Sequence, residues 1–195
     1  MYGKLNKKIG GEKPTPSESV LSVDFSEYKT LVYRNAVTWS EARNATDATD
    51  ADIPRPATTI TSNFAGTSFE LQRALFLFDL TGVIQDITTC ELNYTKNSGD
   101  RDIVALASTI TSTPTLADYD NFTTLLSDNN NQGVETNKLI FNASGIAYIN
   151  ANKGSVIGIC LRDKQYDYLD VQFPSNTYLI NSLNESLPIT LDFTY

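Results

Sequence analysis

The chain has 195 residues, of which 41% are hydrophobic, carries a formal net charge of −8 and contains no histidine. This length corresponds to about one domain, with enough buried surface to fold without disulfides or metals. The acidic charge opposes non-specific binding to nucleic acid. The lack of histidine and of a cysteine cluster excludes Ser-His-Asp, Cys-His and zinc chemistry.

The first predicted element is an extended basic arm, residues 1–22, which precedes a domain of residues 23–195. The arm contains Lys4, Lys7, Lys8 and Lys13 against Glu12, a net charge of +3 that leaves −11 for the rest of the chain. With few apolar residues to bury, the arm cannot offset by itself the entropy lost on ordering. It is therefore expected either to be an unordered terminus or to order against a neighbouring subunit, and a basic arm on an acidic body suits the second role.

The arm shows no targeting signal. Residues 1–11 contain no apolar run that could form the core of a signal peptide. No segment of the chain approaches the roughly 18 consecutive apolar residues of a membrane span. We therefore expect neither secretion nor a membrane partner.

From Val20 onward the pattern is typical of β-strands. Residues 20–25 form a possible short strand, and an apolar stretch follows over residues 29–39. Residues 40–63 are rich in Ser, Thr, Asn and Asp, include prolines and are predicted to be one long irregular loop. A loop of this length in a compact domain is usually functional or packed on a partner.

The stretch Phe69–Leu80 carries two interleaved apolar sets. Phe69, Leu71, Leu75 and Leu77 occupy one side, and Ala74, Phe76 and Phe78 occupy the other. A strand with one wet face alternates apolar and polar residues, so this strand is predicted to begin half-exposed and to end with both faces covered. Residues 90–94 alternate cleanly, as expected of a strand with one covered face. This succession indicates the middle of a two-sheet sandwich.

The remaining strands are predicted over residues 102–107, 138–141, 155–161, 169–173 and 189–195. Short helical turns are expected near residues 118–126 and after Ser144, a possible N-cap. Cys90 and Cys160 lie in apolar strands; a disulfide is possible if these strands are neighbours, but small buried thiols fit the pattern better. Together the elements predict an all-β, antiparallel β-sandwich, most simply a jelly roll, with the extended N-terminal arm.

Several short motifs follow one another in a consistent order over residues 28–195. They are Trp39–Arg43, Arg73–Leu80, Asp118-Tyr119 with Phe122, Phe141–Gly145 with Ile149-Asn150, Gly154 leading into Leu161–Asp163, and Pro188–Leu191. In this order they resemble a jelly-roll β-sandwich domain of phage virion proteins, which is similar to carbohydrate-binding-type modules of the disaggregatase-related group.

The resemblance implies a β-sandwich used for attachment, not for catalysis. We expect a structural component of a bacteriophage virion, assembled in the host cytoplasm, as a head decoration, fibre-base or tail/connector subunit. Its partners would be other virion proteins, including further copies of this chain, with no enzymatic activity and no cofactor. The alternative is a carbohydrate-binding module that recognises a surface polysaccharide. The basic arm in place of a signal peptide, and the lack of a catalytic domain in the chain, favour the virion.

Tyrosines and aspartates alternate in the segment that follows the predicted strand of residues 155–161. Tyr166, Asp167, Tyr168 and Asp170, together with Tyr119, form the candidate surface-binding loop. Tyrosine supplies stiff amphipathic surface and aspartate accepts hydrogen bonds, a combination suited to a sugar or to a protein. The plain structural alternative is a hairpin whose tyrosines cover the edge of a sheet. A glycosidase pair of carboxylates is a third interpretation, which is disfavoured because acidic surface loops are common.

Asp47, Asp50 and Asp52 place three carboxylates close together in a predicted loop. Calcium binds such oxygen ligands, but the spacing lacks the glycine and the bidentate glutamate of an EF-hand loop. A solvated acidic loop without a metal is therefore expected.

Two residues stand out by their type. Arg73 lies in an otherwise apolar strand and is expected to reach from the wetter end of that strand toward Glu70 or Asp79. An ion pair across an interface is the functional alternative. Trp39, the one tryptophan, is expected in the core at the end of a strand rather than on a sugar-binding surface.

Overall fold

The computed structural model of the chain describes residues 20–52, 56–62, 68–99, 102–127, 129–131, 137–174, 176–184 and 186–195. Strands account for 49% of the structure and helices for 15%. All pairings between the described strands are antiparallel. The predicted all-β, antiparallel sandwich is confirmed, whereas its jelly-roll connectivity stays a prediction.

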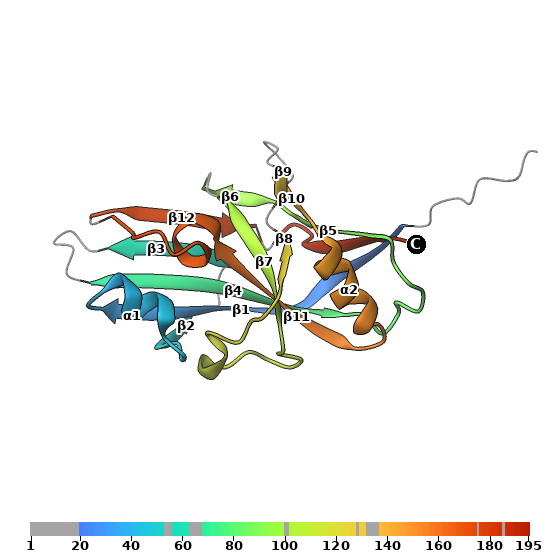
Figure 1. Cartoon of the computed structure of the whole chain (residues 1–195), viewed down its shortest axis with the longest axis horizontal. Coiled ribbons are helices and arrows are strands. Elements are labelled where there is room, and N and C mark those ends of the chain that lie inside the picture. Colours follow the sequence, from blue (N-terminus) through green and yellow to red (C-terminus); the bar gives the residue numbers. More distant parts are fainter. Residues whose placement is uncertain are drawn as a thin grey trace, which may run out of the picture.

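The strands form two sheets that share β1 (Figure 1). Sheet A contains the start of β1 (Val20–Ala36), then β13 (Thr190–Thr194), β5 (Thr89–Tyr94), β10 (Asn137–Ile140) and β9 (Asn129–Asn131). Sheet B contains the rest of β1 with β2 (Asp50–Asp52), β3 (Ala57–Ser62), β4 (Phe69–Asp79), β6 (Lys96–Ser98), β7 (Ile103–Ser108), β8 (Leu125–Ser127), β11 (Val156–Asp163) and β12 (Tyr178–Leu183). The helical elements are α1 (Trp39–Asn44), the 3₁₀ turn η1 (Leu116–Asp118), α2 (Ala143–Ala151) and the π-helical turn η2 (Lys164–Tyr168).

Strand β1 connects the two sheets. Its first residues pair with β13, from Val20 opposite Thr194 to Asp24 opposite Thr190. From Phe25 onward it pairs with β4, and the register shifts between Phe25 and Glu27 and again between Tyr33 and Ala36, as at a β-bulge. The start of β1 therefore lies beside the C-terminus of the chain (Figure 1).

This pairing corrects the predicted boundary of the basic arm. Residues 20–22 were assigned to the arm, but they form the first part of β1 and pair with residues 192–194. The hydrogen bonds of the ladder satisfy their backbone groups, and Leu21 packs against the core. The rest of the predicted arm, with Lys4, Lys7, Lys8 and Lys13, lies outside the described residues.

Strand β4 is covered on both faces, as its sequence predicts. Its side chains alternate between buried and half-buried at the start and are all buried from Arg73 to Phe78. Ala74, Phe76 and Phe78 belong to the core between the two sheets. Leu71, Leu75 and Leu77 belong to a second core on the opposite face of sheet B.

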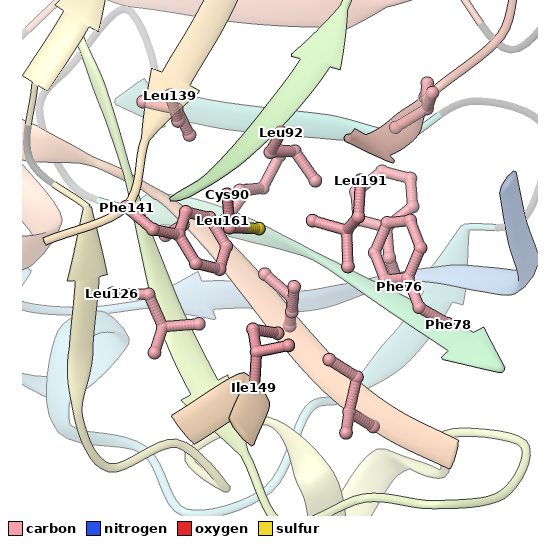
Figure 2. Packing of buried hydrophobic residues seen from close by; sticks show 14 of the residues in the cluster. Phe76, Phe78, Cys90, Leu92, Leu126, Leu139, Phe141, Ile149, Leu161 and Leu191 are labelled. Atoms are coloured by element: carbon pink, nitrogen blue, oxygen red, sulfur yellow. The ribbon is translucent and has the colours of Figure 1, made fainter. Parts of the chain in front are cut away.

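The first core fills the space between sheets A and B. Figure 2 shows Phe76 of β4 and Leu161 of β11 in the same cluster as Leu92 of β5 and Leu191 of β13. Ile149 of α2 joins this cluster from the side (Figure 2), where α2 contacts β8 and β5. The alternating apolar positions of β5 and β13 thus face inward, as expected of strands with one covered face.

The second core lies on the outer face of sheet B, beneath α1 and the segments around η1 and η2. Trp39 comes from α1, Tyr119 follows η1, and Phe173 follows η2. The Trp39 ring lies 5.5 Å from the ring of Phe173 and 6.0 Å from that of Phe69, centroid to centroid. The core position predicted for Trp39 is confirmed.

The two cysteines are free and buried. Cys90 lies in the first core and Cys160 in the second, so sheet B separates the two thiols. The alternative of a disulfide between them is therefore wrong, and the prediction of two buried thiols is confirmed. Burial raises the pKa of Cys160 to about 12 and that of Cys90 well above its usual value.

Residues 40–63 were predicted as one irregular loop, and this is wrong. The segment contains α1, β2 and β3. Thr38 caps α1, because its hydroxyl oxygen accepts a hydrogen bond from the Glu41 amide at 3.1 Å. The amide of Ala48 donates to the carbonyl of Leu116 at 2.7 Å, which ties the loop after α1 to η1.

The other differences lie in the second half of the chain. Residues 169–173 form no strand, because η2 precedes them and Asp170 has a left-handed φ of 56° that a strand does not accommodate. Asn142, not Ser144, caps α2, since its side chain accepts from the Gly145 amide at 2.9 Å. Strand β12 was not predicted. Among the described helices, none has the length and apolarity that a membrane crossing requires.

Candidate functional site

Two arginines lie side by side on the outer face of sheet B. Arg73 of β4 is 0% exposed and Arg162 of β11 is 6% exposed. The two strands are antiparallel neighbours, and their last pair is Leu161 opposite Ala74. Each arginine is adjacent in sequence to one residue of that pair. Two buried guanidinium groups so close together require a buried anion, because an unpaired charge in a low-dielectric interior is strongly destabilising.

Asp167 supplies that anion from η2. Its side chain is 0% exposed, and its carboxylate accepts from Arg73 through Nε at 2.9 Å and Nη2 at 2.8 Å. Arg162 donates to the same carboxylate through Nε at 2.8 Å and through Nη2. Asp167 therefore accepts two parallel bidentate pairs, the geometry in which arginine binds a carboxylate most strongly. We call Arg73, Asp167 and Arg162 the ionic centre.

The remaining donors of Arg73 bind backbone carbonyls of the covering segments. Its Nη1 donates to the carbonyl of Tyr119 at 3.0 Å and contacts Asp120 Oδ1 at 3.3 Å. Its Nη2 donates to the carbonyl of Arg43 at 2.7 Å. One side chain of β4 thus holds α1, the segment after η1 and η2 against the sheet.

Aromatic rings complete the cover of the two guanidinium groups. The Arg73 guanidinium lies 4.2 Å from the ring centroid of Tyr119 and 5.0 Å from that of Phe122. The Arg162 guanidinium lies 4.3 Å from the Phe122 ring. Stacking of this kind suits arginine better than lysine. The Tyr119 hydroxyl donates to the carbonyls of Ala42 and Leu71 at 3.2 and 3.3 Å, and burial raises its pKa.

The protonation state of the ionic centre follows from these contacts. Burial by itself would raise the pKa of Asp167, but the charges of Arg73 and Arg162 and their hydrogen bonds outweigh it and hold that pKa well below its usual range. Burial would lower the pKa of Arg73, and Asp167 reverses that shift. Asp167 is therefore a carboxylate at neutral pH, held by hydrogen bonds from both arginines.

A third arginine extends the network toward the surface. Arg43 of α1 donates from Nε to the carbonyl of Asp167 at 2.8 Å and from Nη2 to that of Tyr168 at 3.5 Å. The same Nε lies 3.2 Å from Asp170 Oδ1. The backbone directly after the ionic centre is therefore held by side-chain donors.

This backbone presents apolar side chains to solvent. Leu169 is 57% exposed and Val171 is 41% exposed, and the φ of 56° at Asp170 between them turns the chain. The amide of Leu169 donates to the carbonyl of Lys164 at 2.9 Å, and that of Val171 to the carbonyl of Gln165 at 3.2 Å. We call Leu169–Val171 the tip. Because these backbone bonds and the donors of Arg43 hold it, the tip presents Leu169 and Val171 from a backbone of defined conformation.

The candidate surface-binding loop is only partly at the surface, which corrects the prediction for two residues. Tyr119 and Asp167 are fully buried, since they belong to the cover and to the anion of the ionic centre. Tyr166 is half-buried, with its ring 5.0 Å from that of Phe173. Tyr168 is half-buried and Asp170 is exposed. The segment is therefore one unit, but its tyrosines form no continuous exposed surface.

Arg73 has a different partner from the one predicted. It pairs with Asp167, which is 94 residues away in sequence, while Glu70 pairs with Arg34 at 2.8 Å. Asp79 accepts instead from the Thr81 amide at 2.9 Å. The position of Arg73 among apolar residues indicated a special role. Its partner Asp167 could not be found from a local sequence pattern, because the two residues are far apart in the chain.

The candidate metal ligands are not gathered into a site. Asp47 and Asp50 are exposed, and Asp50 lies 3.6 Å from Arg34. Asp52 ends β2, and its side chain lies outside the described atoms. Within the part of the chain that the structure describes, no group of three or more acidic or cysteine side chains could hold a metal ion.

Comparison with known proteins adds no relative. No model of a protein family matches the chain, and no curated protein matches it significantly. A function is therefore proposed from the residues and geometry of the chain.

Proposed function

We propose that the protein is a structural component of a bacteriophage virion that acts through protein–protein attachment. The observation that carries the proposal is the tip: exposed Leu169 and Val171 stand on a backbone that the ionic centre holds in place. Exposed apolar side chains on a fixed loop suit a permanent contact with another protein, because little conformational entropy is lost when the contact forms.

The strained backbone at the tip supports the same role. Asp170 adopts a left-handed conformation, which aspartate tolerates but does not prefer. Such conformations persist where the surroundings enforce them, and they cluster at binding sites. Here the enforcing groups are Arg43 and the ionic centre beneath it.

A sugar site at the same loop is less well supported. Stacking against a sugar ring needs an exposed aromatic face, yet Tyr119 is buried and Tyr166 packs on Phe173. Tyr168, which is half-buried, exposes part of its side chain to solvent. The carbohydrate-binding module therefore ranks second, and a glycan array of the purified protein decides between the two.

The virion as the place of attachment is supported by the order of motifs in the sequence. Two of these motifs, Arg73–Leu80 and Leu161–Asp163, lie on the neighbouring strands that carry the arginines of the ionic centre. The acidic body also disfavours a nucleic-acid partner. Within the particle, the proposal covers a head decoration, a fibre base or a tail/connector subunit.

The test is mass spectrometry of purified phage particles that carry the gene for this chain. We expect the chain at a fixed, multiple copy number per particle. Leu169→Asp with Val171→Asp should abolish incorporation while leaving the melting temperature unchanged, because both side chains are exposed. The matched control is Ile84→Asp, which changes an 81% exposed apolar residue in the turn after β4.

Three results would count against the proposal. Absence of the chain from particles would refute its role as a virion component. Equal loss of incorporation in the Ile84→Asp control would remove the tip as the contact. Micromolar binding to a glycan, abolished by Tyr168→Ala, would instead establish the carbohydrate-binding module.

A further inference from the structure

The outer face of sheet A differs from that of sheet B because its side chains remain open to solvent. Alternate residues of β1, β13, β5 and β10 point away from the first core and are half-buried or exposed. Among them are Asp24, Asp192, Glu91, Asn93 and Lys138. The described charged groups of this face are three carboxylates and one ammonium group, and Val20 and Ile140 are its exposed large apolar residues.

The carboxylates of this face are arranged unfavourably for an isolated sheet. Asp192 and Glu91 stand directly opposite each other in neighbouring strands, and like charges in that position are destabilising. Lys138 Nζ binds Glu91 at 2.9 Å to each oxygen. Asp192 accepts from two neutral donors within the described part of the chain, Ser22 at 2.5 Å and Asn93 at 2.9 Å.

The complementary charge stands in the first residues of the same chain. Residues 1–13 have a net charge of +3, and the remainder of the chain has −11. This segment precedes Val20, which enters sheet A opposite Thr194. The 19 residues before Val20 can span up to about 60 Å when extended, which is enough to reach a neighbouring molecule.

The direction of β1 favours a second molecule over the same one. From Val20 the strand runs across the face toward Asp24, so the preceding segment could cover the face of its own molecule only by reversing direction. A second copy can be reached without that reversal.

We propose that Lys4, Lys7, Lys8 and Lys13 of one molecule bind the outer face of sheet A of a second copy, beside Asp24 and Asp192. The contact is head-to-tail, so each copy offers one arm and one face and the arrangement repeats along a ring or a filament. It rests on the proposed function, because it supplies the multi-copy assembly that a virion component requires. It uses a different surface from the tip.

The test is sedimentation velocity of the full chain with exchanged charges. The arm-reversed variant carries Lys4→Glu, Lys7→Glu, Lys8→Glu and Lys13→Glu, and the face-reversed variant carries Asp24→Lys and Asp192→Lys. The matched control is Asp47→Lys with Asp50→Lys, which makes the same change of charge near β2, far from the C-terminus beside the face (Figure 1). Circular dichroism confirms that each variant is folded.

The wild-type chain should associate at low salt and dissociate as salt rises, because exposed charges are screened. Each lost ion pair should weaken association by up to about fivefold. Each reversed variant should therefore be monomeric alone, and an equal mixture of the two should associate again, since each then offers what the other needs. The control should associate like the wild type.

A monomeric wild type, a mixture that stays monomeric, or a control that dissociates equally would each overturn this contact. The outcomes separate it from the proposed function. Association as expected, with the chain absent from particles, would keep the contact and remove the virion role. Incorporation into particles by a chain that is monomeric in solution would keep the virion role and refute the contact.

Discussion

Asp167→Asn tests the ionic centre directly, because it keeps the size of the side chain and removes its charge. In the variant, Arg73 and Arg162 would stay buried at 0% and 6% exposure without an anion between them. The amide would offer one acceptor oxygen where the carboxylate offers two, and its NH₂ group would face guanidinium donors.

The expected magnitude follows from this loss. Removing one partner of a buried ion pair destabilises a protein by about 3–5 kcal/mol, because the remaining charge stays buried. With a urea dependence of about 2 kcal/mol per molar, the midpoint of unfolding should fall by roughly 2 M. This is a large share of the about 5–15 kcal/mol by which a domain is usually stable.

Urea unfolding followed by circular dichroism measures this shift. The matched control is Asp170→Asn, the same change three residues away, at a side chain that is 60% exposed and pairs with Arg43. An exposed pair contributes about 0–1 kcal/mol, so the control should change the midpoint little. Equal effects of the two substitutions would refute the conclusion that Asp167 is the buried counter-ion shared by the two arginines.

The pH dependence of stability gives a second test of Asp167. Its pKa is lower in the folded state than in the unfolded state, where an aspartate has a pKa of about 3.9. Its contribution is therefore complete above the unfolded pKa and is lost as the pH falls below it. The wild type should lose this share of stability in acid, and Asp167→Asn should not. Parallel pH profiles of the two proteins would contradict this assignment.

Three further predictions concern the rest of the chain. Gly158→Ala should destabilise by about 1–3 kcal/mol in thermal melts, because a Cβ there would lie 2.7 Å from a backbone oxygen, whereas Gly82→Ala meets open space and should be neutral. The two cysteines should react with a thiol reagent only after unfolding, since burial raises both pKa values; rapid reaction of the folded protein would contradict their burial. Deleting residues 1–19 should leave the melting temperature nearly unchanged, and deleting residues 1–24 should lower it because the pairing with β13 is lost; unfolding of the shorter deletion would place the arm in the core.

The sequence predicts the parts of the fold that local periodicity determines. The two apolar sets of β4 fall on opposite faces of sheet B, and the alternation of residues 189–193 places Leu191 and Phe193 in the first core. Both cases depend only on the period of a strand and on burial. The same rule failed over residues 169–173, where an alternating pattern forms an exposed turn because η2 and Asp170 redirect the backbone.

The candidate site could be predicted only in part. The sequence marks Asp167, Tyr168 and Asp170 as one segment, and it marks Arg73 as unusual among apolar neighbours. It does not connect them, because the pair is 94 residues apart and depends on β4 and β11 being neighbours in the sheet. Periodicity shows that a face is covered but not which segment covers it, so a buried aspartate and an exposed one look alike in sequence.

The two outer faces of the sandwich differ in what covers them. On sheet B, apolar burial alone would not fix the positions of α1 and η2 on the sheet, because hydrophobic contacts have little directionality. The ionic centre adds directional bonds from Arg73 to the carbonyl of Arg43 and to the carboxylate of Asp167. That face is thereby used within the molecule, and Leu169 and Val171 of the tip are exposed on its cover. On sheet A, among the described residues, Asp24 is exposed and Asp192 is half-buried, which leaves this face to the proposed contact with a second molecule.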